Sequence, residues 1–167
     1  MGFDQSKLVE LLRRSYFAVD GLWFMMAEKE RGFEDTLELD ERVWQVMPKI
    51  QARKARELLR LRGATLAELA QCFALKLTSE GHRFEVVWHG SEGLEFVISR
   101  CPWLDMLQRA DRMHVAQTVA QVICVGEGQA WAAEFSANLQ CQLADKMCSG
   151  DARCRYLFRR TARMASV

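Results

Sequence analysis

The sequence predicts an α+β fold: a helical N-terminal half, followed by a four-stranded antiparallel sheet with helices packed on one face. Two observations predict it. Apolar residues recur every three or four positions up to residue 81, and runs rich in β-branched and aromatic residues follow Gly81. The length of 167 residues, half of them apolar, suits one domain with a sizeable core. We expect a single domain over 1–167, with a helical half at 1–81 and a sheet-containing half at 82–162.

Three helices are expected in the helical half, over residues 4–29, 34–61 and 66–80. Pro48 lies inside the second pattern, so we expect a kink or break just before it. Thr65 is the expected N-cap of the third helix, with Glu68 completing a capping box. Gly32, Gly63 and Gly81 are the expected ends of the three helices.

The sheet should form from four extended runs. "RFEVVWHG" and "LEFVISRC" read as a β-hairpin, because "GSEG" lies between two runs of β-branched and aromatic residues. Helical texture returns over residues 102–135, with a break expected at Gly126. "LQCQLADKM" and "RCRYLFRR" then close the chain with alternating polar and apolar residues, as half-buried strands do. The arginine-rich face of the last strand is either solvated or meets a partner.

Composition excludes several classes of partner. A net charge of +1 argues against nucleic-acid binding through bulk electrostatics. The most apolar stretch, "YFAVDGLWFMMA", is interrupted by Asp20 and is shorter than the roughly 20 residues of a membrane-spanning helix. No secretory signal is visible at the start, so six cysteines indicate reduced thiols. We therefore expect a cytoplasmic protein without nucleic-acid or membrane partners.

Three cysteines lie at expected element boundaries, where functional side chains tend to collect: Cys101, Cys124 and Cys154. The other three look like core or strand residues: Cys72, Cys141 and Cys148. No pair has the C-x-x-C spacing of zinc fingers or thioredoxin-like proteins. The three boundary thiols either share a site or simply pack, since free cysteine is often buried. His82 and His89, seven residues apart, match no metal-ligand spacing.

Glu127 is flanked by Gly126 and Gly128 in "CVGEGQAW". The glycines should deny it helical support and let backbone or a ligand approach closely. The carboxylate is then either the N-cap of a helix over "GQAWAAEF" or a functional group. In the functional case it would act as a general base toward water or bind a metal beside thiolates.

Asp20 lies within an apolar helix, where an ionised carboxylate is costly unless it is paired. It either forms a buried ion pair with a cation of the second helix (Arg53, Lys54 or Arg56) or recognises a cationic substrate in a cavity. The eight methionines and five tryptophans either fill the core or line such a cavity. In the second case the predicted substrate-binding residues are Asp20, Trp23, Arg53 and Trp131.

The motifs "SRCPWLDML", "CVGE" and "GDARCRYLF" resemble, in this order, those of the L-2-amino-thiazoline-4-carboxylate hydrolase family and of a neighbouring family of uncharacterised cytosolic proteins. The resemblance covers roughly residues 83–160. Cys101 matches the first motif, Cys124 and Glu127 the second, and Cys154 the third. The last motif is also similar, more distantly, to small-ligand domains related to 4-vinyl reductases. Asp is usual in the family where Glu127 stands, and an acid often follows the last cysteine, where Arg155 stands.

The resemblance implies hydrolytic opening of a small cyclic amidine. Water, or the thiolate of Cys124, would attack the amidine carbon, and Glu127 would carry the proton. Cys101, Cys124, Cys154 and Glu127 would hold a metal ion, zinc or iron, or else shape the pocket. The alternative is a small-ligand or metal-binding sensor without catalysis. A third possibility is that the apolar helical half forms a homodimer interface and the cysteines only pack.

Overall fold

The computed structural model describes residues 2–161. They form, in chain order, α1 (Gln5–Arg31), α2 (Phe33–Trp44), α3 (Met47–Leu58), α4 (Leu66–Glu80), β1 (Arg83–His89), β2 (Gly93–Arg100), α5 (Pro102–Arg109), the 3₁₀ turn η1 (Met113–Val115), α6 (Ala116–Phe135), β3 (Leu139–Leu143), the 3₁₀ turn η2 (Met147–Ser149) and β4 (Cys154–Arg160). This confirms the α+β class and the four expected strands.

The four strands form one antiparallel sheet in the order β1-β2-β4-β3. Alternate residues of each strand point to the same face, and the register brings Phe96 beside Tyr156 and Leu94 beside Phe158. These side chains are buried against the helices. The opposite face carries the polar alternates, as expected for a sheet covered on one side.

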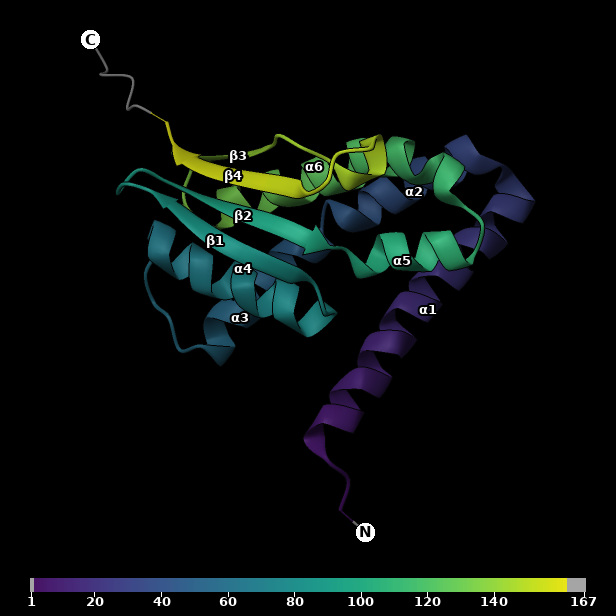
Figure 1. The fold of residues 1–167 in the computed structure, drawn as a ribbon, viewed down its shortest axis with the longest axis horizontal. Helices are drawn as coiled ribbons and strands as arrows, with labels where there is room; N and C mark the ends of the chain where they lie inside the picture. Colours follow the sequence, from purple (N-terminus) through teal and green to yellow (C-terminus); the bar gives the residue numbers. More distant parts are fainter. Residues whose placement is uncertain (1, 162–167) are drawn as a thin grey trace.

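Helices α4 and α6 cover the inner face of the sheet, and α3 packs against both of them (Figure 1). The core is centred on Phe73 of α4, which is fully buried. Its ring meets four others edge-on, with centroids 4.9 Å from Phe96, 5.2 Å from Trp131 and Phe158, and 5.6 Å from Tyr156. The core therefore joins the helical half to the sheet.

Most helix boundaries follow the expected local chemistry, but α3 ends at Leu58, before the expected end at Gly63. The second helical pattern breaks at Gln45 and Val46, and Pro48 lies in the first turn of α3, where its missing N–H is tolerated. At the start of α4, the Glu68 N–H donates to Thr65 Oγ1 at 3.2 Å and the Thr65 N–H donates to the Glu68 carboxylate at 2.9 Å. Both the break and the capping box are confirmed.

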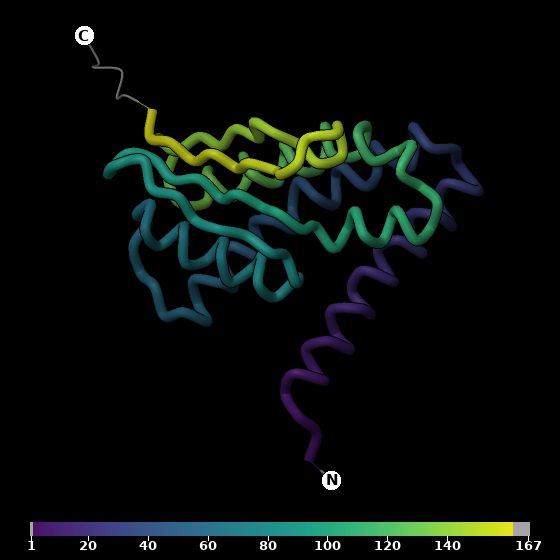
Figure 2. The backbone as a smooth tube through the Cα atoms, viewed as in Figure 1, coloured from purple at the N-terminus to yellow at the C-terminus, as the bar shows by residue number. Residues whose placement is uncertain are grey.

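Helix α1 contains no buried residue, and its N-terminal part extends away from the rest of the molecule (Figures 1 and 2). It exposes many large apolar side chains, among them Leu8, Leu11, Leu12, Val19, Leu22 and Met26. The homodimer hypothesis stays a prediction, and a dimer that used α1 would cover these side chains. Across residues 2–161, no helix has both the length and the apolarity required to cross a bilayer.

Helix α6 continues without interruption through Gly126, Glu127 and Gly128, so the expected break at Gly126 and the N-cap role of Glu127 are wrong. The reason for Gly128 is close packing rather than a turn. A Cβ there would lie 2.6 Å from Cys141 Sγ and 3.1 Å from the Tyr156 ring, whereas one at Gly126 would meet nothing within 4 Å. Gly128 lets α6 approach the sheet, which brings Glu127 into the interior.

We predict opposite effects for alanine at these two glycines. Gly126→Ala should stabilise the protein by roughly 0.5–1 kcal/mol, because alanine is the better helix former and the site is open. Gly128→Ala should destabilise it by about 1–3 kcal/mol, because α6 must move off the sheet. Denaturant unfolding of both variants tests this. Equal effects at the two positions would contradict the packing role of Gly128.

Candidate functional site

A cavity of about 100 Å³ lies between the helical half and the sheet, and we call it the Lys76 pocket. The structure brings Cys101, Cys124, Cys154 and Glu127 to this one pocket, together with Asp20. Cys124 and Cys154 pack against the main apolar core, and Cys101 against a smaller cluster formed by Leu104, Leu107 and Ala116. The pocket therefore opens where the two apolar clusters meet.

The pocket holds a buried ion-pair network. Lys76 Nζ lies 2.7 Å from Glu127 Oε1 and 2.9 Å from Glu80 Oε2, and all three side chains are at least nine-tenths buried. Gln51 Nε2 donates to the second oxygen of Glu80 at 3.3 Å. Lys76 and Glu80 are one turn apart on α4, and Glu127 reaches them from α6. Two carboxylates thus face one ammonium group.

The network keeps Lys76 charged. Burial alone lowers the pKa of Lys76, but Glu127 and Glu80 outweigh it, so the pKa is raised. Burial raises the pKa of Glu80 despite the attraction of Lys76. His82 lies beside the pair, with Nδ1 at 3.6 Å from Glu80 Oε2. Burial and the Lys76 charge lower the pKa of His82 to about 3, so the imidazole is neutral at pH 7.

Two further carboxylates, Asp20 of α1 and Asp40 of α2, line the pocket. Burial raises the pKa of both, and the neighbouring Asp20 charge contributes to bringing the pKa of Asp40 to about 7. The nearby Trp44 side chain opposes the shift of Asp40. Within residues 2–161, no cationic side chain lies near enough to lower either pKa.

The three thiols are protonated at neutral pH. Burial, followed by the charges of Glu127 and Cys101, raises the pKa of Cys124 well above its usual value. Burial likewise raises the pKa of Cys101 to about 11 and the pKa of Cys154. The Cys154 sulfur also accepts a hydrogen bond from the Met147 N–H at 3.2 Å. Because a thiolate is the nucleophile and the metal ligand, the closed pocket does not activate these groups.

The predicted zinc or iron centre requires several ligand side chains that converge on one point. Across residues 2–161, no three side chains of His, Cys, Asp or Glu stand close enough together to hold a metal ion. The thiols share a pocket but do not converge on one point, and they are protonated. The residues as arranged do not fit the zinc or iron site, and we derive no step through a metal.

The other predicted substrate-binding residues lie outside the pocket. Arg53 binds Glu134 through two hydrogen bonds of 2.9 and 2.8 Å, so the expected ion pair with Asp20 is wrong. Trp131 is fully buried and stacks on Phe135, because it occupies the core face of α6. Trp23 is 46% exposed, on a side of α1 that does not face the pocket.

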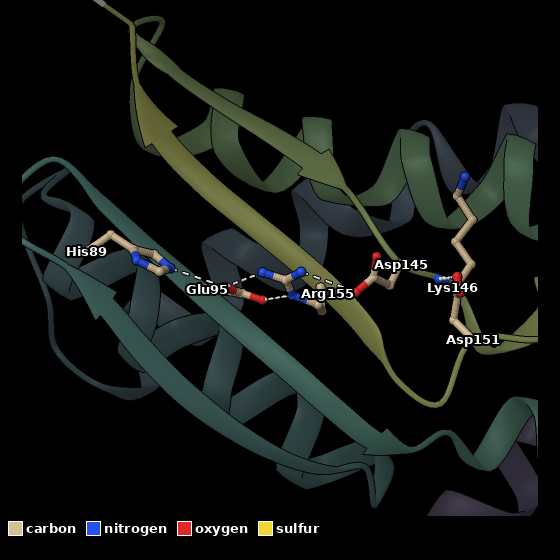
Figure 3. Close-up of polar contacts among 6 residues, drawn as sticks. All are labelled: His89, Glu95, Asp145, Lys146, Asp151 and Arg155. Atoms are coloured by element: carbon tan, nitrogen blue, oxygen red, sulfur yellow. Dashed lines mark hydrogen bonds and ion pairs between the residues drawn. The ribbon is translucent and has the colours of Figure 1, made fainter.

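Arg155 lies on the outer face of the sheet, away from the thiols, because it alternates with Cys154 and Tyr156 along β4 (Figure 3). It hydrogen-bonds the buried carboxylate of Glu95, and its Nη1 donates to Asp145 at 3.2 Å. His89 Nε2 lies 3.1 Å from the same Glu95. Arg155 therefore adds no charge to the pocket, and it is paired within the chain.

The sequence contains a signal for Lys76 and Glu80, which were not among the predicted site residues. Lys76 falls seven positions after Leu69 and three after Phe73, so it lies on the inward face of its helix. A lysine there is buried only with a partner, and Glu80 follows at the i+4 position that such a pair requires. By contrast, no local pattern indicates Asp40, whose burial depends on where α2 meets α1.

Comparison with known proteins places the chain without naming an activity. No curated protein matches the sequence. A family model matches residues 3–153, which are most of the 167 residues and include all the cysteines except Cys154. The chain therefore belongs to a family of unknown function, DUF6125.

Proposed function

We propose that the protein hydrolyses a C–N bond of a small cyclic amidine bound in the Lys76 pocket. The observation that carries the proposal is that Glu127, held by Lys76 at 2.7 Å, lines the same small cavity as Cys124. A buried carboxylate fixed by an ammonium group is a well-placed general base. The motifs that resemble the L-2-amino-thiazoline-4-carboxylate hydrolase family supply Cys101, Cys124, Glu127 and Cys154 to this cavity.

In the proposed reaction, a water oxygen bonds to the amidine carbon while its proton passes to Glu127. The proton then moves to the ring nitrogen whose bond to that carbon breaks, so atoms and charge balance. Lys76 contacts Oε1 of Glu127 and positions it, which leaves the other oxygen for water. A protonated amidine is a cation, and it would offset the surplus of carboxylates in the pocket.

The pKa of Cys124 favours water over the thiol as nucleophile. Burial raises that pKa, and Glu127, one turn away on α6, raises it further. Forming a thiolate there would place a second negative charge beside the carboxylate. Cys124 then acts as a neutral group of the pocket wall that contacts the substrate.

The test uses 2-amino-2-thiazoline-4-carboxylate as substrate, with mass spectrometry to detect a ring-opened product that is one water heavier. Glu127→Gln should lower kcat by roughly 10²–10⁴-fold, because it removes the base but keeps the shape. Cys124→Ser should retain activity within about tenfold if water attacks. Glu134→Gln is the matched control, since Glu134 is on the same helix but pairs with Arg53 outside the pocket.

Three results would count against this proposal. Wild-type protein that binds the aminothiazoline without turning it over would support a small-ligand sensor instead. An active Glu127→Gln variant would remove the assigned base. A loss of activity in Cys124→Ser that equals that of Glu127→Gln would reject water and make the thiol the nucleophile.

A further inference from the structure

A second hollow, of about 390 Å³, adjoins the Lys76 pocket, and we call it the apolar chamber. Four residues line both: Asp20, Asp40, Trp103 and Val119. The rest of its wall comes from α1, α5 and the segment leading to α6. Its size falls in the range of roughly 300–1,000 Å³ that small-molecule sites occupy. The two cavities thus share a wall that carries both acids.

The chamber is lined mainly by apolar side chains, and an ion pair connects two of the segments that form its wall. Phe24, Met25, Met106 and Leu107 are among the lining side chains. The absence of a side chain at Gly21 leaves space in the chamber, because a Cβ at that position would lie 3.4 Å from the Met106 side chain. At the rim, Arg112 forms an ion pair of 2.7 Å with Glu28, which connects the segment before η1 to α1. An apolar group in the chamber would be removed from water.

The shared wall is suited to a cation. Asp20 and Asp40 line both cavities, neither has a cationic partner among residues 2–161, and Asp40 is only 8% exposed. Buried carboxylates gain from a ligand cation, because an opposite charge offsets the cost of ionising them away from water. Aromatic side chains lie beside them, including Trp44 and Trp103, and indole rings attract cations.

We propose that the ligand is an amphiphilic organic cation: its charged head lies in the Lys76 pocket beside Asp20 and Asp40, and its apolar body extends into the chamber. The inference rests on the proposed function in that the head is the amidine that Glu127 would attack. It goes further by assigning the class of substituent that the substrate carries.

The experiment measures the Kd of a series of straight-chain amidines, from acetamidine to octanamidine, by calorimetry. Each added methylene should tighten binding roughly three- to fourfold until the chamber is full. The uncharged amides of the same lengths should bind at least tenfold more weakly, because they cannot offset the two carboxylates. If the Kd of the amidines does not change with chain length, the chamber does not bind the apolar body of the ligand. If the amides bind as tightly as the amidines of the same length, the shared wall is not a cation site.

Gly21→Leu is the variant that tests the chamber directly. The leucine side chain fills the space beside Met106, and it should abolish the gain from longer chains while leaving acetamidine binding unchanged. The variant should fold, since leucine is a far better helix former than glycine. Val19→Leu is the matched control on the same helix, because Val19 is 63% exposed and lines neither cavity. A full chain-length gain in Gly21→Leu would overturn the proposal.

The outcome is distinguishable from that of the hydrolase proposal because binding is measured without turnover. If the protein binds long amidines tightly but hydrolyses no amidine, the proposed ligand class stands and the proposed hydrolysis is wrong. If the protein opens the aminothiazoline ring but its affinity for amidines does not increase with chain length, the proposed hydrolysis stands and the proposed role of the chamber is wrong.

Discussion

Lys76→Met should destabilise the protein by about 3–5 kcal/mol at pH 7–8, the largest effect that we expect for a polar residue. The substitution keeps an unbranched side chain but leaves Glu80 and Glu127 buried together without their cation. Removing one partner of a buried ion pair has this cost because the remaining charge stays desolvated. Urea unfolding of the wild type and the variant measures it.

The loss should shrink as the pH falls. Burial already raises the pKa of Glu80, and without the opposing charge of Lys76 that folded-state pKa lies further above the unfolded value of about 4.3. Carboxylates of this kind contribute most stability below the unfolded pKa and lose it as the pH rises through the folded pKa. The deficit of Lys76→Met should therefore be smallest near pH 4 and largest above pH 7.

Two comparisons make the Lys76 result specific. Lys54→Met is the matched control, because Lys54 is 59% exposed and pairs with Glu57, so it should change stability by no more than about 0.5–1 kcal/mol. The triple variant Lys76→Met, Glu80→Gln, Glu127→Gln should recover much of the loss, since no buried charge remains. If Lys76→Met costs no more than Lys54→Met, the ion-pair network does not stabilise the fold.

Phe73→Ala should destabilise the protein by roughly 3–5 kcal/mol. Phe73 has no exposed surface, and its ring contacts four aromatic rings that come from both β2 and β4 and from α6. Truncation would leave a cavity where the helical half meets the sheet. Its ring also lies 5.6 Å below Lys76 Nζ, so the variant should loosen the pocket as well as the core.

Phe3→Ala is the control for this prediction, because Phe3 is 67% exposed and should cost less than about 0.5 kcal/mol. Phe73→Leu keeps most of the volume and should lose considerably less than alanine does. Thermal and urea unfolding give both values. A loss for Phe73→Ala that matches Phe3→Ala would mean that the core does not depend on this ring.

Local chemistry explains the elements that could be predicted. The capping box of Thr65 and Glu68 and the position of Pro48 act over a few residues, so they have the same meaning in any fold. The hairpin and the last two strands followed from alternation and from β-branched and aromatic content. Cys101, Cys124 and Cys154 line one pocket. The family resemblance favoured this arrangement, whereas nothing in the spacing of the three cysteines requires it.

The wrong predictions share one cause. The sequence does not show which side chains lie opposite a given residue across the core. Gly126 and Gly128 read as a helix end, yet α6 continues, because Cys141 and Tyr156 leave no room for a side chain at Gly128. Arg53, Lys54 or Arg56 was expected to pair with Asp20, but Arg53 binds Glu134 of α6, Lys54 pairs with Glu57, and Arg56 donates to the backbone carbonyls of Glu134 and Gly63.

Periodicity in the sequence was enough to specify the order of helices and strands, the inward faces of α4 and of the strands, and the presence of charged residues on apolar faces. Those properties depend on periodicity and on short-range hydrogen bonds. The packing of the helices on the sheet was needed to bring Lys76 to Glu127 and to place Asp20 and Asp40 in the wall shared by the pocket and the chamber. The physical reason is that a buried charge takes its pKa and its partners from elements distant in sequence, and packing alone sets which elements these are.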